Sequence, residues 1–175
     1  MKGRRNKMTE AIIYDSLSGN TETLAKEIKS IKKNAYYEKV NDKLIEELPE
    51  YDIYYIGSPI IKGMCTDKIK SILQKLENKK IFLFITTGYK KEDYYKSLTK
   101  RIQEIIPKSN QIVGIFLCQG KMQEAVKERY IKLIQEHPED KNLKVSLENF
   151  EQAKTHPDEK DKKDLIEKIQ KLNLT

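Results

Sequence analysis

A cluster of hydroxyl side chains follows the first apolar run of the chain. The run Ala11-Ile12-Ile13-Tyr14 leads into Asp15-Ser16-Leu17-Ser18-Gly19-Asn20-Thr21, and helical periodicity begins directly afterwards. Backbone amides at the start of a helix have no partner within that helix, so they can bind a phosphate without a cation. Gly19 would let the main chain approach the anion, and the three hydroxyl groups can donate hydrogen bonds. The segment therefore predicts a phosphate site, with an ordinary polar helix cap as the simpler alternative.

The same segment lacks two common nucleotide motifs. It is not GxxxxGK[ST], so we do not expect a nucleoside triphosphatase site. It is not GxGxxG either, so we do not expect a dinucleotide site of the Rossmann type.

Short runs rich in Ile, Val, Tyr and Phe predict the strands that position this loop. They lie at residues 11–14, 35–37, 53–56, 81–85 and 112–117. The last three begin about 30 residues apart, which is the repeat length of a β-α-β unit. Because their apolar residues are successive and not alternate, we expect both faces of the sheet to be covered, as in parallel sheets.

The segments between these runs carry helical periodicity. The apolar faces are Leu24, Ala25, Ile28 and Ile31; Ile69, Ile72, Leu73 and Leu76; Leu98, Ile102, Ile105 and Ile106; Val126, Tyr130, Leu133 and Ile134; and Leu165, Ile166, Ile169 and Leu172. Residues 137–153 show no clear pattern. We interpret His137-Pro138 and His156-Pro157 as helix boundaries and not as metal ligands. The prediction is an α/β fold, a doubly wound three-layer sandwich with a five-stranded parallel sheet, whose ligand binds beyond the carboxyl ends of the strands.

Three of the loops after these strands resemble the flavin loops of the flavodoxin family. The first is Ser-x-Ser-Gly-Asn-Thr, the second is Gly57-Ser58-Pro59-Ile60-Ile61-Lys62-Gly63, and the third is Thr86-Thr87-Gly88-Tyr89. The resemblance covers about residues 9–120. It is to the short-chain flavodoxins, because no large insertion interrupts the fifth strand.

This resemblance implies FMN as the cofactor and assigns a role to each loop. The phosphate would be held by Ser16, Ser18, Gly19, Asn20 and Thr21. One side of the isoalloxazine ring would be flanked by Ser58, Pro59, Ile60, Ile61, Lys62 and Gly63, and the other side by Thr86, Thr87, Gly88 and Tyr89. Tyr89 is expected to stack on the ring, because a tyrosine offers a flat apolar face. Gly63 would adjust the backbone near flavin N5.

The chain departs from the family in its aromatic content and its charge. It has no Trp, so Ile60, Ile61 and Met64 would leave one side of the flavin aliphatic. Flavodoxins that donate electrons are usually acidic, whereas this chain has a net charge of +7. Lys62 either points to solvent or lies near flavin N1, where a cation would favour the anionic reduced flavin.

Composition excludes several classes of protein. No apolar run is long enough for a membrane span, and no signal peptide is visible, so we expect no membrane partner. Four basic residues gather in a leader over residues 1–8, which we expect to be disordered, ahead of one domain over residues 9–175. The remaining charges interleave, which disfavours nucleic acid as a partner. Two cysteines, Cys65 and Cys118, fit a cytoplasmic location and are read as small buried hydrophobes.

Two functions follow from the resemblance. The first is transfer of electrons from FMN to a redox protein partner, either a reductase or a flavin-dependent acceptor enzyme, by a monomer or weak dimer. The second is an FMN-dependent reductase of quinones or pigment-like small organics. The ending Cys118-Gln119-Gly120-Lys121-Met122 also resembles, more weakly, the flavodoxin-like proteins that accompany microbial bilirubin reductases. A flavin-free interaction module is disfavoured, because the phosphate loop is intact.

Overall fold

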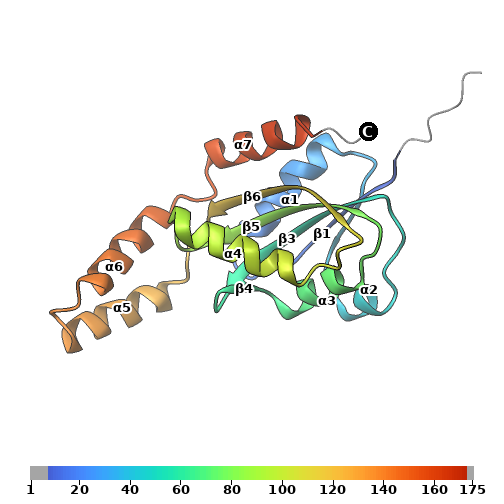
Figure 1. The fold of residues 1–175 in the computed structure, drawn as a ribbon. Coiled ribbons are helices and arrows are strands. Elements are labelled where there is room, and N and C mark those ends of the chain that lie inside the picture. Colours follow the sequence, from blue (N-terminus) through green and yellow to red (C-terminus); the bar gives the residue numbers. More distant parts are fainter. Residues whose placement is uncertain (1–7, 173–175) are drawn as a thin grey trace, which may run out of the picture.

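A computed structural model describes residues 8–172 of the chain (Figure 1). Strands and helices alternate along most of this length, as the sequence predicts. The prediction of a disordered leader falls, apart from Met8, outside the described residues. None of the helices in this part of the chain combines the length and the apolarity that a membrane crossing requires.

The five predicted strands form one parallel sheet. They are β1 (Glu10–Tyr14), β2 (Tyr36–Lys39), β3 (Ile53–Ile61), β5 (Lys80–Thr87) and β6 (Gln111–Gln119). Their order is β2-β1-β3-β5-β6, and every neighbouring pair is parallel. The chain moves outward in one direction from β1 to β2 and in the other direction from β3 onward. The carboxyl ends of β1 and β3 therefore flank the switch point at which α/β sheets bind ligands.

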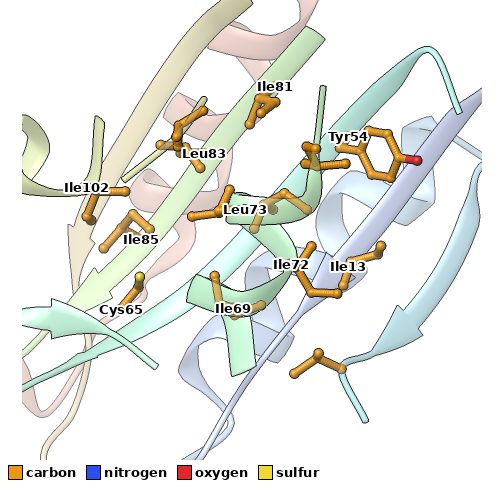
Figure 2. Close-up of a cluster of buried hydrophobic side chains, with 14 of the residues drawn as sticks. Ile13, Tyr54, Cys65, Ile69, Ile72, Leu73, Ile81, Leu83, Ile85 and Ile102 are labelled. Carbon is orange, nitrogen blue, oxygen red and sulfur yellow. The ribbon is translucent and has the colours of Figure 1, made fainter. Parts of the chain in front are cut away.

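Helices cover both faces of the sheet, which makes the molecule a three-layer sandwich. On one face lie α1 (Asn20–Ile31) and α7 (Glu159–Gln170), and on the other lie α2 (Asp42–Glu46), α3 (Asp67–Lys75) and α4 (Glu92–Glu104). Alternate strand residues serve the two cores, since Ile12 packs with α1 and α7 whereas Ile13 packs with α3. Figure 2 shows the second core, in which Ile69, Ile72 and Leu73 of α3 meet the sheet.

The second predicted flavin loop is a β-hairpin and not an open loop. Strand β3 continues to Ile61, and a short strand β4 (Met64–Cys65) pairs antiparallel with its end. Lys62 and Gly63 form the connection, with φ of 50° and 77°. Positive φ at both central residues is typical of the two-residue turns that suit the twist of a hairpin. The sequence did not indicate this hairpin, because Lys is uncommon at a positive φ.

Between β6 and α7, a helical hairpin projects from the sandwich. It consists of α5 (Glu124–Glu136) and α6 (Lys141–Ala153), and Figure 1 shows it projecting beyond the end of the sheet. The sequence predicted α5 but gave no pattern for α6. The predicted apolar face of α5 is its less exposed side, since Val126, Tyr130, Leu133 and Ile134 are half-buried, although no side chain of α5 is fully buried. The two helices pack mainly on each other, and α6 buries only Phe150 and Ala153.

Both His-Pro pairs mark helix boundaries, as predicted. α5 ends at Glu136, directly before His137. α7 begins after His156-Pro157, where Asp158 accepts a hydrogen bond from the Asp161 amide at 2.8 Å. The Asp161 carboxylate accepts from the Asp158 amide at 2.9 Å in return, and His156 Nδ1 lies 2.6 Å from the same carboxylate. These three side chains therefore hold the start of the last helix.

Candidate functional site

The loop between β1 and α1 presents backbone amides that have no partner in the protein. Gly19 caps α1 with φ of 86°, in the left-handed region, where a residue with a Cβ is strained. Within the described chain, the amides of residues 18–21 make no hydrogen bond, whereas the Glu22 amide donates to Ser16 Oγ and the Thr23 amide donates to the Gly19 carbonyl. Four unpaired amides at the positive end of a helix are suited to an anion.

The side chains of this loop fix its shape as well as offering donors. Asn20 Nδ2 donates to Ser18 Oγ at 3.0 Å and to the carbonyl of Lys121 at 2.9 Å, so it ties the loop to the end of β6. A Cβ on Gly120 would lie 2.5 Å from Asn20 Nδ2, and only glycine allows this close approach. The hydroxyls of Thr21 and Thr86 are 2.8 Å apart and buried. The loop is therefore held in place before any ligand arrives.

A cleft of about 560 Å³ opens at the carboxyl ends of β1, β3, β5 and β6. The residues from the sequence prediction that line it are Ser18, Asn20, Pro59, Ile60, Ile61, Lys62, Thr86, Thr87, Gly88 and Tyr89. Three loops that are far apart in the sequence thus meet at one cavity, as the resemblance implied. Volumes of roughly 300–1,000 Å³ are usual for cofactor sites.

The other predicted residues lie beside this cleft and not on its surface. Ser58 is fully buried, where its hydroxyl donates to the Pro59 carbonyl and accepts from the Thr66 amide at 3.1 Å. Ser16 and Thr21 are buried behind the loop. Gly63 forms the hairpin turn, and Gly19 lines a neighbouring cavity of about 290 Å³. Lys121, Lys154 and His156 also line that cavity, so the loop lies between two hollows.

Sequence reasoning missed the wall that the helical hairpin contributes. Leu17, Gly120, Lys121, Met122, Gln123, Val126, Arg129, Tyr130 and Asn149 also line the cleft. The sequence indicated part of this wall, because residues 118–122 follow a predicted strand and so lie at the carboxyl end of the sheet with the other flavin loops. Asn149 gave no signal, since it lies at the far end of the helical hairpin in sequence and reaches the cleft only through the fold of that hairpin.

Asn149 connects α6 to the loop after β5. Its Nδ2 donates to the Gly88 carbonyl at 2.6 Å, and its Oδ1 accepts from Gln119 Nε2 at 3.0 Å and from the Lys90 amide at 3.4 Å. Tyr89 is half-buried beside this network, with its ring edge-on to that of Tyr94 at a centroid distance of 5.6 Å. Hydrogen bonds from Asn149 of α6 therefore hold the loop after β5 in place, which is the loop that would flank a flavin.

The cleft carries positive charge and no negative charge. Its lining side chains include Lys62, Lys121 and Arg129 but no Asp, Glu, His or Cys. The nearby Cys118 is buried, and this burial raises the pKa of its thiol far above the ordinary range. Burial also raises the pKa of Cys65, to about 11. Neither thiol is a nucleophile in this state, since the thiolate is the reactive form.

The fold and this site define the class of the protein. A model of the flavodoxin domain matches residues 11–170, which is most of the chain. The chain belongs to the flavodoxin family.

Individual relatives agree with this assignment. The chain is 36% identical over 159 residues to a flavodoxin-like domain-containing protein BilS of Clostridioides difficile (strain CD3), covering 88% of this chain and 90% of the relative. It is 30% identical over 168 residues to a BilS protein of Clostridium symbiosum (strain WAL-14163), covering 86% and 88%. The structure of Trp repressor binding protein from Bacillus subtilis superimposes with a TM-score of 0.51 at 16% identity, covering 65% of this chain and 85% of that one, which supports the fold.

FMN is the cofactor that family membership and the cleft together identify. The unpaired amides at the start of α1 fit its phosphate. The cleft has the volume of a cofactor site, and Ile60, Val126 and Tyr89 give it apolar surface for a flat ring. Lys62 and Arg129 would lie near the ring, while Lys121 lies near the phosphate loop.

Proposed function

We propose that this chain is an electron carrier that transfers electrons from bound FMN to a partner redox enzyme. The observation that carries the proposal is the chemistry of the cleft. Among the described residues, those that line the cleft include no His, Asp, Glu or Cys, so the side chains there that could take part in proton transfer are lysines and tyrosines, none of which is itself a redox centre. All redox chemistry would therefore come from the flavin ring, which accepts and releases electrons when bound.

The residues of the chain would bind and orient the cofactor. The amides of residues 18–21 would hold the phosphate, and Thr86 and Thr87 would supply hydroxyls near the ring. Tyr89 would cover one face, and Ile60 and Ile61 would exclude water from the other. The chain offers no Trp, so aliphatic side chains would cover the face of the ring opposite Tyr89.

A second candidate is an FMN-dependent reductase of quinones or pigment-like small organics. The wall formed by Val126, Arg129 and Tyr130 favours it, because apolar and aromatic side chains beside the flavin loops offer a surface on which a flat organic substrate could bind. A pigment-like substrate such as bilirubin is suggested by the resemblance of residues 118–122 to the flavodoxin-like proteins that accompany microbial bilirubin reductases.

We further propose a cytoplasmic protein that acts as a monomer or weak dimer and has neither nucleic acid nor membrane as a partner. Support comes from the two buried free thiols, which suit a reducing compartment. Along most of the chain outside the leader, basic and acidic residues interleave, which supports the absence of an extended nucleic-acid surface.

One experiment separates the two candidates. The FMN-loaded protein is mixed with NADPH or NADH and with menadione or bilirubin, and absorbance is followed under nitrogen. The carrier proposal predicts no sustained oxidation of the nicotinamide, but oxidation of the chemically reduced protein by ferricyanide. Repeated turnover of menadione or bilirubin by the protein alone would contradict the carrier proposal and support the reductase.

A further inference from the structure

The loops around the flavin cleft are basic. Segments 16–21, 58–66, 86–91 and 119–123 together contain four lysines and no acidic residue. α5 adds one arginine to the same cavity. We call this set the basic face; its members are Lys62, Lys90, Lys91, Lys121 and Arg129, and all five are exposed.

Contacts place these five cations around one opening. Lys62, Lys121 and Arg129 line the cleft directly. Lys91 Nζ lies 5.3 Å from the ring centroid of Tyr89, which also lines it. Lys90 does not line the cleft, but it follows Tyr89 in the chain and its amide donates to Asn149, and both of these residues line the cleft.

None of the five forms an ion pair with any residue that the structure describes. Elsewhere on the same helical hairpin, Lys127 pairs with Glu151 at 2.9 Å and Lys154 pairs with Glu151 at 2.6 Å. These two lysines near the cleft thus share one carboxylate, whereas the five cations of the basic face have no ion-pair partner among the described residues. Like charges that gather without counter-charges repel one another, and an acidic surface placed over them would relieve this repulsion.

Two exposed apolar side chains accompany the basic face. Leu17, which lines the cleft from the phosphate loop, is 63% exposed, and Ile61, at the end of β3, is 41% exposed. Apolar residues at the centre and charged residues at the rim are the usual composition of a transient protein interface.

We propose that the basic face is the docking surface for a redox partner whose own electron-transfer site is surrounded by acidic residues. This inference rests on the proposed carrier function and specifies the chemistry of the partner. Opposite potentials on the two proteins would steer their encounter, with the flavin edge directed at the redox centre of the partner. Each encounter would move one electron from the reduced flavin to the partner, and the proton that the flavin loses would pass to water.

Equilibrium binding provides the first test. The oxidised FMN-loaded protein is titrated with cytochrome b5, an acidic haem protein, and with cytochrome c, a basic one, at rising NaCl concentration. The basic face predicts tighter binding to cytochrome b5, with an affinity that falls as salt is added. Tighter binding to cytochrome c, or affinities that are independent of salt, would overturn the proposal.

A pair of charge-reversed double variants locates the effect. Lys90→Glu with Arg129→Glu alters the basic face, whereas Lys33→Glu with Lys108→Glu changes the net charge equally at the opposite end of the sheet. The first variant should bind cytochrome b5 at least about tenfold more weakly, and the second should change binding by less than about threefold. Equal weakening by both would mean that only total charge matters, which overturns the proposal.

Electron transfer distinguishes failure of this inference from failure of the carrier function. Dithionite-reduced protein is mixed with each ferric cytochrome, and haem reduction to the ferrous state is followed. Faster reduction of cytochrome b5, slowed by the first double variant, supports the inference. Faster reduction of cytochrome c would leave the carrier function intact and refute the basic face. If the reduced protein fails to reduce either cytochrome and also fails to reduce ferricyanide, the carrier function itself is refuted.

Discussion

Gly19 is the residue on which phosphate binding depends most directly. Its φ of 86° turns the chain so that the following amides point outward, and nothing lies within 4 Å of the position that a Cβ would take. A side chain there would therefore project freely beside the anion.

Replacing Gly19 by Asp should abolish tight FMN binding, because the carboxylate would repel the phosphate. We expect the FMN dissociation constant to rise at least about 100-fold, with most of the fold intact. Gly19→Asn is the matched control, since asparagine tolerates left-handed backbone and carries no charge. The measurement is quenching of FMN fluorescence on titration with apoprotein. Equal weakening in both variants would contradict the electrostatic explanation.

Asn149 is the residue that holds the third flavin loop. Asn149→Ala would leave the Gly88 carbonyl and the buried Gln119 side chain without this partner. Loss of stability should be about 1–3 kcal/mol in urea unfolding, with weaker FMN binding. Ser146→Ala on the same helix is the control, because Ser146 Oγ bonds only the Asn142 carbonyl of α6 itself. Its effect should stay within about 0.5 kcal/mol. A similar loss in both variants would show that Asn149 has no special role.

At the scale of single elements, the start of α7 should respond to acid. A hydrogen bond from the Asp161 backbone amide, helped by the nearby His156, lowers the pKa of Asp158. A pKa that is lower in the folded state gives stability above the unfolded pKa, and this stability disappears as pH falls through the folded value.

Asp158→Asn should therefore lower the melting temperature at pH 7 and have a smaller effect at pH ~2, because the wild-type carboxyl takes up its proton only as pH falls through its lowered folded pKa. Thermal unfolding of both proteins at the two pH values measures the difference. A destabilisation of the same size at both values would contradict the role of the charge.

The elements also show how far sequence reasoning reaches. The strands were predictable because residues such as Ile12 and Ile13 are buried on opposite faces, which produces continuous apolar runs. α6 was not predictable, because it packs mainly on α5, so Val145 stays 41% exposed and the helical pattern is weak. The phosphate loop was readable from local residues, whereas Arg129 and Asn149 reach the cleft only through tertiary placement.

At the scale of the whole molecule, the sandwich and the helical hairpin should differ in stability. α5 has no fully buried side chain, whereas α1 buries Leu24, Ala25 and Ile28. Few buried contacts permit local opening. We therefore expect hydrogen exchange to be faster in residues 124–153 than in α1 and β3 of the apoprotein.

FMN should slow this exchange selectively. Most of the cleft wall lies within residues 120–130, so binding should protect this segment. The end of α7 should change little, because Leu172, just beyond it, lies beside Gly114 near the start of β6 and away from the cleft. Mass spectrometry of apoprotein and FMN-loaded protein measures both regions. Uniform protection of the chain, or none in residues 120–130, would contradict the placement of the helical hairpin as a wall of the site.

The most direct test of the account compares FMN with riboflavin, which has the same ring but no phosphate. Both are titrated into apoprotein, and their dissociation constants are measured by fluorescence quenching. Because the unpaired amides before α1 bind the phosphate, FMN should bind at least about 100-fold more tightly. Equal affinities, or no binding of either flavin, would contradict the central claim that this loop anchors FMN through its phosphate.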